Sequence, residues 1–232
     1  MPFKVILFST LLLLGFQLRA QDDLPVLSAD AADYLIEVSR AVDDNRYSEI
    51  RGTPYRYKEF KTVLLYDITL NKYTIDSANL NGFTSQFEYY VDGQLRELLP
   101  GNFIRADVYG TENGVHRYAR GINHKFRDNY AEIVYKGENI TATMIYNVIN
   151  DEKIVQNVGK TLKLRRFSAK SLHFALVDGD LVPITMSPKK LAADLGFKKE
   201  LTEFIKAGKL KPGTREDLLT IYKKADELVE MQ

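Results

Sequence analysis

Apolar and polar residues alternate with a period of two through most of the segment 61–177, which is typical of strands with one buried face. In the segment Lys160–Phe167, Leu162 and Leu164 share one side, and Lys163 and Arg165 share the other. Asp178-Gly179 tolerates the backbone geometry of a tight hairpin, so Leu172–Val177 and Leu181–Ile184 are predicted to pair in antiparallel fashion. The same signals predict further strands at Thr62–Tyr66, Lys72–Ile75, Phe87–Val91, Leu95–Leu98, Phe103–Tyr109, Val115–Arg120, Tyr130–Tyr135 and Asn139–Val148.

Helical spacing of apolar residues marks the two ends of the pattern. One amphipathic helix is predicted over Leu27–Val42. Ser187 and Pro188 suit the start of a second helix, and Thr214 with Asp217 has the spacing of a capping box for the last one. The predicted tail helices are Pro188–Leu195, Lys199–Ala207 and a closing helix that continues through Val229.

These elements predict an α+β fold: a mainly antiparallel β meander with one N-terminal helix and a C-terminal helical tail. Strand order is not encoded locally, so an open sheet, a sandwich and a partial barrel all remain consistent with the pattern. The expected division is a signal peptide over 1–20, the first helix and the β domain over 21–185, and a helical tail packed on the sheet over 186–232.

The N-terminus has the three parts of a secretory signal peptide. Lys4 supplies the positive charge, Val5–Phe16 the apolar stretch, and Leu18-Arg19-Ala20 the residues before cleavage between Ala20 and Gln21. The apolar run has 12 residues, whereas a membrane-spanning helix needs about 20. Export is therefore predicted, to the periplasm, the cell surface or the medium, with no transmembrane span after cleavage.

Composition narrows the class of protein further. Cleavage would remove Lys4 and Arg19 and leave 30 basic against 31 acidic residues, a balance that argues against a general nucleic-acid binder. The chain has no Cys. Because exported eukaryotic domains often carry disulfides, this favours a bacterial envelope or extracellular protein. No Gly-rich phosphate loop or dinucleotide fingerprint occurs, so no cofactor is predicted.

The three histidines are the first candidates for catalysis or metal binding. Ser171, His173 and Asp178 suggest a hydrolase triad, but residues i and i+2 of one strand are about 6.6 Å apart, too far for a relaxed hydrogen bond. His116 and His124, near Asp107 or Asp128, could bind a metal, although their eight-residue separation is not a usual ligand spacing.

A basic cluster and an abundance of aromatic residues offer two binding alternatives. Arg105, Arg117, Arg120, Arg165 and Arg166 could hold an anion if the strands bring them together; outward-facing arginines on a solvated sheet face are the simpler interpretation. The 14 Tyr and 12 Phe could line an apolar cavity for a small molecule, or simply pair across strands.

The segment Phe126–Glu227 resembles the C-terminal part of a family of exported β-rich proteins from Bacteroidota. The resemblance is carried by Tyr130–Gly137, Leu172–Gly179, Ser187–Leu195, Phe197–Leu210 and the closing helix. Upstream, Gly52–Tyr55 and Leu65–Asp67 are similar to the opening motif and first strand of that family, whereas Leu99–Lys125 departs from it. The resemblance implies a fold and a compartment, and no activity.

The sequence therefore favours an exported, non-enzymatic binding or envelope-assembly module, with an envelope or secreted protein as its partner. Two alternatives remain: a secreted hydrolase or metal-dependent enzyme that uses His116, His124 or His173, and a small-molecule carrier inside a curved sheet.

Overall fold

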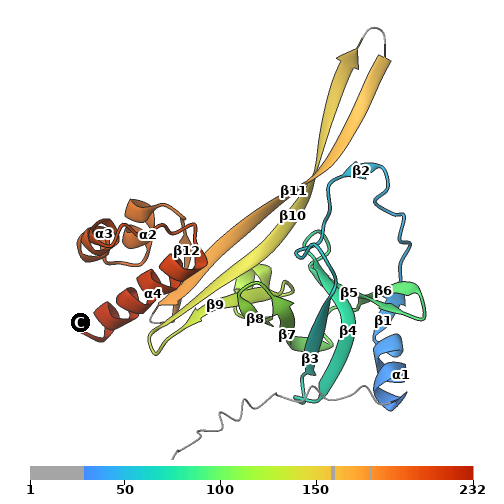
Figure 1. Ribbon diagram of the computed structural model, residues 1–232, viewed down its shortest axis with the longest axis horizontal. Helices are drawn as coiled ribbons and strands as arrows, with labels where there is room; N and C mark the ends of the chain where they lie inside the picture. Colours follow the sequence, from blue (N-terminus) through green and yellow to red (C-terminus); the bar gives the residue numbers. More distant parts are fainter. Residues whose placement is uncertain (1–28, 158–159, 178, 232) are drawn as a thin grey trace, which may run out of the picture.

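The computed structural model describes residues 29–157, 160–177 and 179–231. The predicted signal peptide and its cleavage site at Ala20 and Gln21 lie outside these residues. In the described part of the chain, strands form a single open, mainly antiparallel sheet, and four α-helices lie at its two ends (Figure 1). The α+β class is confirmed, and of the three sheet forms the structure has the open one. No described helix is long and apolar enough to cross a membrane.

The sheet has the strand order β1-β6-β5-β4-β3-β7-β8-β9-β10-β11-β12, and β2 pairs with β11 in parallel. Its strands are β1 (Ser39–Ala41), β2 (Ile50–Arg51), β3 (Lys61–Asp67), β4 (Lys72–Asn81), β5 (Gln86–Val91), β6 (Gln94–Leu98), β7 (Phe103–Thr111), β8 (Gly114–Ala119), β9 (Ala131–Lys136), β10 (Ile140–Asn157), β11 (Lys160–Val177) and β12 (Asp180–Ile184). The helices are α1 (Ala29–Glu37), the 3-10 turn η1 (His124–Phe126), α2 (Pro188–Asp194), α3 (Lys198–Ala207) and α4 (Arg215–Glu230).

Two hairpin turns lie where the sequence predicts them. Asp92 and Gly93 both have positive φ, 50° and 76°, as the tight turn between β5 and β6 requires. Gly179 has φ 87° at the start of β12. Residue type alone therefore located these hairpins, because few residues tolerate this backbone conformation.

Three local expectations were wrong. The first helix ends at Glu37, because Ser39–Ala41 instead forms β1 and pairs with β6. Lys160–Phe167 and Leu172–Val177 are parts of one continuous strand, β11. Thr214 does not cap α4 through its side chain; its hydroxyl donates to the carbonyl of Lys211, and the Asp217 carboxylate accepts the Lys211 N–H at 2.9 Å.

Two hydrophobic clusters fill the molecule. One lies under β3–β8 and α1, and includes Leu65, Phe87 and Tyr118. The other lies where α2, α3 and α4 cover β9, β10 and β12, and includes Ile140, Leu201 and Tyr222. Tyr146 on β10 contacts both clusters. The helical tail is thus packed on the sheet by apolar burial, which is the main stabilising term in a fold of this kind.

The longest strands, β10 and β11, extend beyond every other described element (Figure 1). Phe167 marks the point where they leave the body: it is buried between Tyr47 and Phe83, with ring centroids 5.1 and 5.5 Å away. From the level of Phe167 outward, starting at Ile149 next to its cross-strand partner Asn150, the described residues 149–157 and 160–166 form what we call the arm. Apart from the pairing of β10 with β11, the described strand that pairs with the arm is β2, at Arg165 and Arg166.

Candidate functional site

A buried carboxylate, Glu132 on β9, organises the polar interior beside the second half of the sheet. It is fully buried. Arg215, the first residue of α4, donates to its Oε1 at 2.6 Å, and Arg56 Nη2 lies 3.6 Å from its Oε2. The pair Glu132–Arg215 therefore joins the sheet to the tail helix. Burying a carboxylate costs several kcal/mol unless it is paired in this way.

A chain of hydrogen bonds connects Glu132 to the surface. The Tyr118 hydroxyl donates to Glu132 Oε2 at 3.5 Å, and it lies 2.6 Å from the Tyr57 hydroxyl. Tyr57 is in turn 3.0 Å from Nδ1 of His116. Burial raises the pKa of Tyr57 and of Tyr118, so both hydroxyls stay protonated and able to donate.

His116 is the last residue of this series of hydrogen bonds. Burial lowers its pKa, and although Glu132 acts in the opposite direction, Arg215 and Arg56 lower the pKa further. The ring is therefore neutral at pH 7. Its Nε2 is buried and has no hydrogen-bond partner among the described residues.

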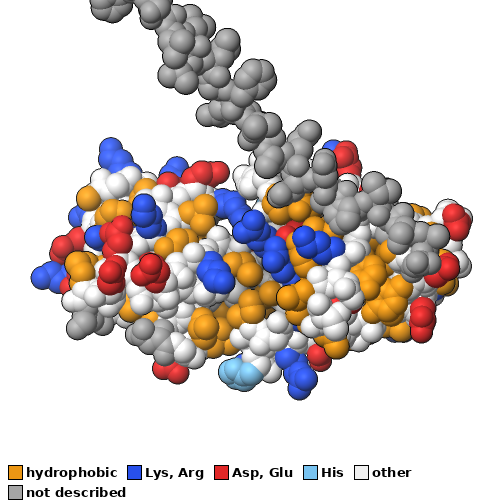
Figure 2. Space-filling model, turned by 90° about the horizontal axis from the view of Figure 1, so that it is seen from below, with side chains coloured by type: hydrophobic (Ala, Val, Ile, Leu, Met, Phe, Trp, Pro, Cys, Tyr) orange, Lys and Arg blue, Asp and Glu red, His pale blue; other side chains and the backbone are white. Residues whose placement is uncertain are grey.

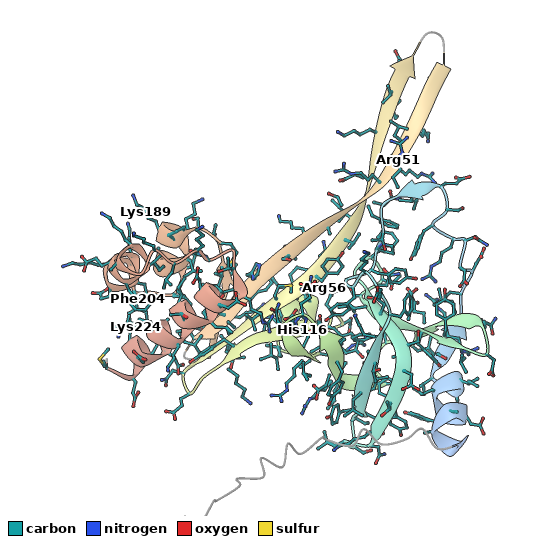
Figure 3. All side chains as sticks on the ribbon, in the orientation of Figure 1. Arg51, Arg56, His116, Lys189, Phe204 and Lys224 are labelled. Atoms are coloured by element: carbon teal, nitrogen blue, oxygen red, sulfur yellow. The ribbon has the colours of Figure 1, made fainter. Side chains whose placement is uncertain are left out.

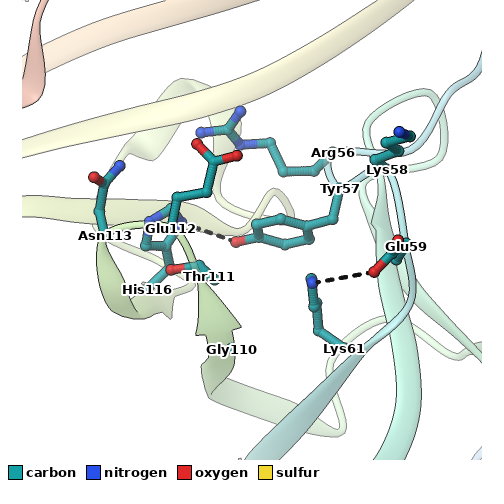
Figure 4. Close-up of a pocket in the computed structure, with 10 residues that line it drawn as sticks. All are labelled: Arg56, Tyr57, Lys58, Glu59, Lys61, Gly110, Thr111, Glu112, Asn113 and His116. Carbon is teal, nitrogen blue, oxygen red and sulfur yellow. Dashed lines mark hydrogen bonds and ion pairs between the residues drawn. The ribbon is translucent and has the colours of Figure 1, made fainter.

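A cavity of about 410 Å³ opens beside His116 (Figure 4). One wall is the segment before β3 together with its first residue, and the other is the turn between β7 and β8. Its lining residues are Arg56, Tyr57, Lys58, Glu59, Lys61, Gly110, Thr111, Glu112, Asn113 and His116.

The wall before β3 is held in place by a buried side chain. Asn79 on β4 accepts the Tyr57 N–H at 3.1 Å and donates to the Tyr57 carbonyl at 2.8 Å. An amide side chain thus takes the place of a neighbouring strand, since it offers one acceptor and one donor to the same backbone. The segment is fixed although it forms no regular strand.

The arm is a second candidate site, and it projects away from the part of the molecule where Arg56 and His116 lie (Figure 3). Four large apolar side chains on it are solvent-exposed: Ile149, Ile154, Val155 and Leu164. The stretch 149–166 also carries five basic and two acidic residues. Glu152 contacts Lys163 at 3.5 Å and Arg165 at 3.3 Å, and Asp151 lies opposite Arg166. The arm is therefore apolar and net cationic.

The five arginines predicted to form an anion site are not gathered around one point. Arg105 on β7 and Arg117 on β8 share one face of the sheet, where Arg105 pairs with Asp107 at 2.5 Å. Arg120 donates to Gln86 and lies over the Tyr130 ring, 4.0 Å from its centroid. Arg165 and Arg166 belong to the arm, three strands further along the sheet. Basic side chains do gather across the middle of the face shown in Figure 2.

The histidines also occupy separate places. His124 is exposed in η1, whereas His116 and His173 lie towards Glu132 from β8 and β11. Among the described residues no group of three or more His, Cys, Asp or Glu side chains could hold a metal ion. Ser171 pairs across the strands with Tyr146, and His173 with Met144 and Ile184.

Sequence reasoning missed Glu132, Arg56, Tyr57 and Arg215. One signal was present: with the period of two of a strand, Glu132 shares a face with Tyr130 and Val134, both of which are buried. A carboxylate at a core position of a strand demands a cation from elsewhere in the chain. Which cation supplies it could not be inferred, because Arg215 is far away in sequence.

The comparisons with known proteins add no relative to this picture. Neither protein-family models, nor curated proteins, nor solved structures gave a match to this chain.

Proposed function

We propose that this protein is an exported, non-enzymatic binding module of the bacterial cell envelope, and that the arm is its contact with an acidic surface of a partner protein. The observation that carries the proposal is the exposure of Ile149, Ile154, Val155 and Leu164 on a projecting two-stranded ribbon.

A projecting two-stranded ribbon of this kind has little stability of its own. An isolated two-stranded hairpin is marginally stable in water. Ile149, Val155 and Leu164 lie on one face of the ribbon and Ile154 on the other, so both faces expose apolar side chains that a partner could cover. A partner that covers the arm would remove these side chains from water. Burial of these side chains would therefore stabilise the complex, although in the free protein they remain exposed and add little to its stability.

Charge indicates the chemistry of that partner. Arg165, Arg166, Lys153 and Lys163 outnumber Asp151 and Glu152 on the described part of the arm. Complementary charge speeds association and excludes partners of the same sign. An acidic protein surface with an apolar centre matches both properties. Export rests on the predicted signal peptide, and an envelope location agrees with the resemblance to exported Bacteroidota proteins.

The test is site-specific photo-crosslinking in cells that produce the full chain. A crosslinking residue replaces Ile154 on the arm, and in a control variant it replaces Lys189 on α2, which is also exposed but distant from the arm (Figure 3). We expect one acidic protein to be captured from position 154 and not from position 189.

The captured protein is then purified and its affinity measured directly. Arg165→Glu and Ile154→Asp should each weaken binding about tenfold or more, and added salt should weaken it as well. Unchanged affinity in both variants would refute the proposal. So would capture of a second copy of this chain alone, or of a nucleic acid, since either would assign the arm a different occupant.

A further inference from the structure

The charges around Glu132 do not balance. One carboxylate faces two guanidinium groups, and Arg215 holds its near oxygen at 2.6 Å while Arg56 remains 3.6 Å away. Arg56 Nε is buried and has no hydrogen-bond partner among the described residues. The side chain is partly buried, and a buried donor without a partner is unfavourable. Arg56 is thus a cation only partly neutralised by the protein.

Two further cations stand beside it. Lys58 and Lys61 line the same cavity, and all three residues come from the segment 56–61. Lys61 has a counter-ion in Glu59 at 3.8 Å. Lys58 makes no ion pair with any described residue, so its ammonium group is free to meet a ligand.

Arg56 is held in a fixed position. Its guanidinium lies over the Tyr57 and Tyr146 rings, 5.8 and 5.4 Å from their centroids, and Asn79 fixes the backbone next to it. A ligand therefore meets an arginine whose side-chain entropy is already partly lost. Such preorganisation increases affinity without any additional contact.

We infer that the cavity between the segment 56–61 and the turn joining β7 to β8 binds a small anion bearing a carboxylate or a phosphate group, through Arg56 and Lys58. Guanidinium groups match both oxyanions in geometry. The volume of about 410 Å³ is that of a small-molecule site. Glu59 and Glu112 on the rim disfavour highly charged ligands and leave room for an uncharged or cationic part.

His116 and Tyr57 support the site from behind. Both line the cavity, and their hydrogen bond links it to Tyr118 and Glu132. Glu132 also binds Arg215 of α4. If a bound anion moves Arg56 away from Glu132, Arg215 becomes the remaining ion-pair partner of Glu132 among these two arginines. The inference is independent of the arm, which shares no residue with this cavity.

The test is titration of the full chain with inorganic phosphate and, separately, with succinate at constant ionic strength, followed by calorimetry and by NMR shifts of backbone amides. We expect saturable binding with a Kd on the order of 1 mM or tighter. The shifts should centre on residues 56–61 and 110–116. Tighter binding of one probe identifies the oxyanion as phosphate or carboxylate.

Lys58→Glu is the decisive variant, because Lys58 is exposed and its replacement leaves the fold intact. It should weaken binding about tenfold, whereas Lys189→Glu, the same charge change on α2, should alter Kd less than about twofold. Arg56→Gln should abolish saturation, with circular dichroism confirming the fold.

Absence of saturation below about 10 mM for both probes would overturn the inference. Equal weakening by Lys58→Glu and Lys189→Glu would overturn it too, since that result indicates general charge screening. Crosslinking from position 154 should be unaffected by Lys58→Glu, so failure of the anion site and failure of the arm proposal are told apart.

Discussion

The carboxylate of Asp226 on α4 accepts the backbone N–H of Ile140 at 2.7 Å, at the turn that connects β9 to β10. The same carboxylate accepts the N–H groups of Glu138 at 3.1 Å and Asn139 at 2.9 Å. One side chain of the tail therefore satisfies three consecutive backbone donors of the sheet. Hydrogen bonds to an ionised acceptor are stronger than neutral ones, so this contact fixes α4 against the turn between β9 and β10, at the opposite end of β10 from the arm.

Asp226→Ala should lower the free energy of unfolding by about 2–4 kcal/mol, because three turn donors lose a charged acceptor. Urea denaturation measures the change. Glu227→Ala is the matched control: this neighbouring carboxylate is exposed and, among the described residues, forms an ion pair with Lys224 at 3.0 Å. We expect that variant to stay within about 0.5 kcal/mol of the parent. Equal effects of the two substitutions would contradict the role assigned to Asp226.

Gly82→Ala should be severely destabilising. A Cβ at Gly82 would lie 2.5 Å from Cδ1 of Tyr146 and 2.8 Å from Cγ2 of Val148, well inside van der Waals contact, so β10 would have to move away from the end of β4. We expect a loss of about 2–3 kcal/mol, the cost of overpacking a filled site, seen as a lower Tm.

Gly213→Ala is the comparison for that experiment, because nothing lies within 4 Å of its Cβ. Its Tm should be unchanged or slightly higher. If Gly82→Ala also left Tm unchanged, the close approach of β10 to the end of β4 would be wrong.

Glu132→Gln should cost about 3 kcal/mol or more, because it leaves Arg215 and Arg56 without their carboxylate in a buried site. Arg215→Met removes the other member of the close pair. In a double-mutant cycle the two substitutions should couple by about 1–3 kcal/mol. Strict additivity in the unfolding free energies would show that the 2.6 Å contact does not hold α4 to the sheet.

The two buried histidines predict a loss of stability in mild acid. Burial lowers the pKa of both His116 and His173, so between the folded-state pKa and about 6.5 the unfolded chain binds more protons than the folded one. Stability therefore rises with pH through this window: it is lost as the pH falls from about 6.5 towards the folded-state pKa, and these two groups cause no further loss below that pKa. Glu132, Arg56 and Arg215 face His116 and set the size of the effect.

The measurement is the unfolding free energy of His173→Gln and of the parent protein at several pH values from about 5 to 8. The parent should lose more stability on acidification than the variant does. His124→Gln, at an exposed position in η1, should keep the parental pH dependence. A parental slope in His173→Gln would show that this histidine contributes nothing to it.

Local chemistry was enough to predict the hairpins and the tail helices. Asp92-Gly93 tolerates the positive φ that a tight hairpin turn requires, and Pro188 suits the first turn of a helix. Of the arm, the strand Lys160–Phe167 was predicted, but its pairing with residues 150–157 was not. Residues 150–153 are Asn-Asp-Glu-Lys, a polar run typical of a loop, and they form a strand only because Phe167 through Leu164 lie opposite them with matching hydrogen-bonding groups.

The candidate sites divide in the same way. The sequence determined that the chain has no cysteine, few histidines and an apolar tail stripe, because these are properties of residue type and spacing. Only the tertiary structure decided that Arg56, His116, Glu132 and Arg215 meet, and that five arginines expected to cluster do not. Strand order and helix docking bring distant residues together through burial and backbone pairing, and neither is encoded in any short stretch of the chain.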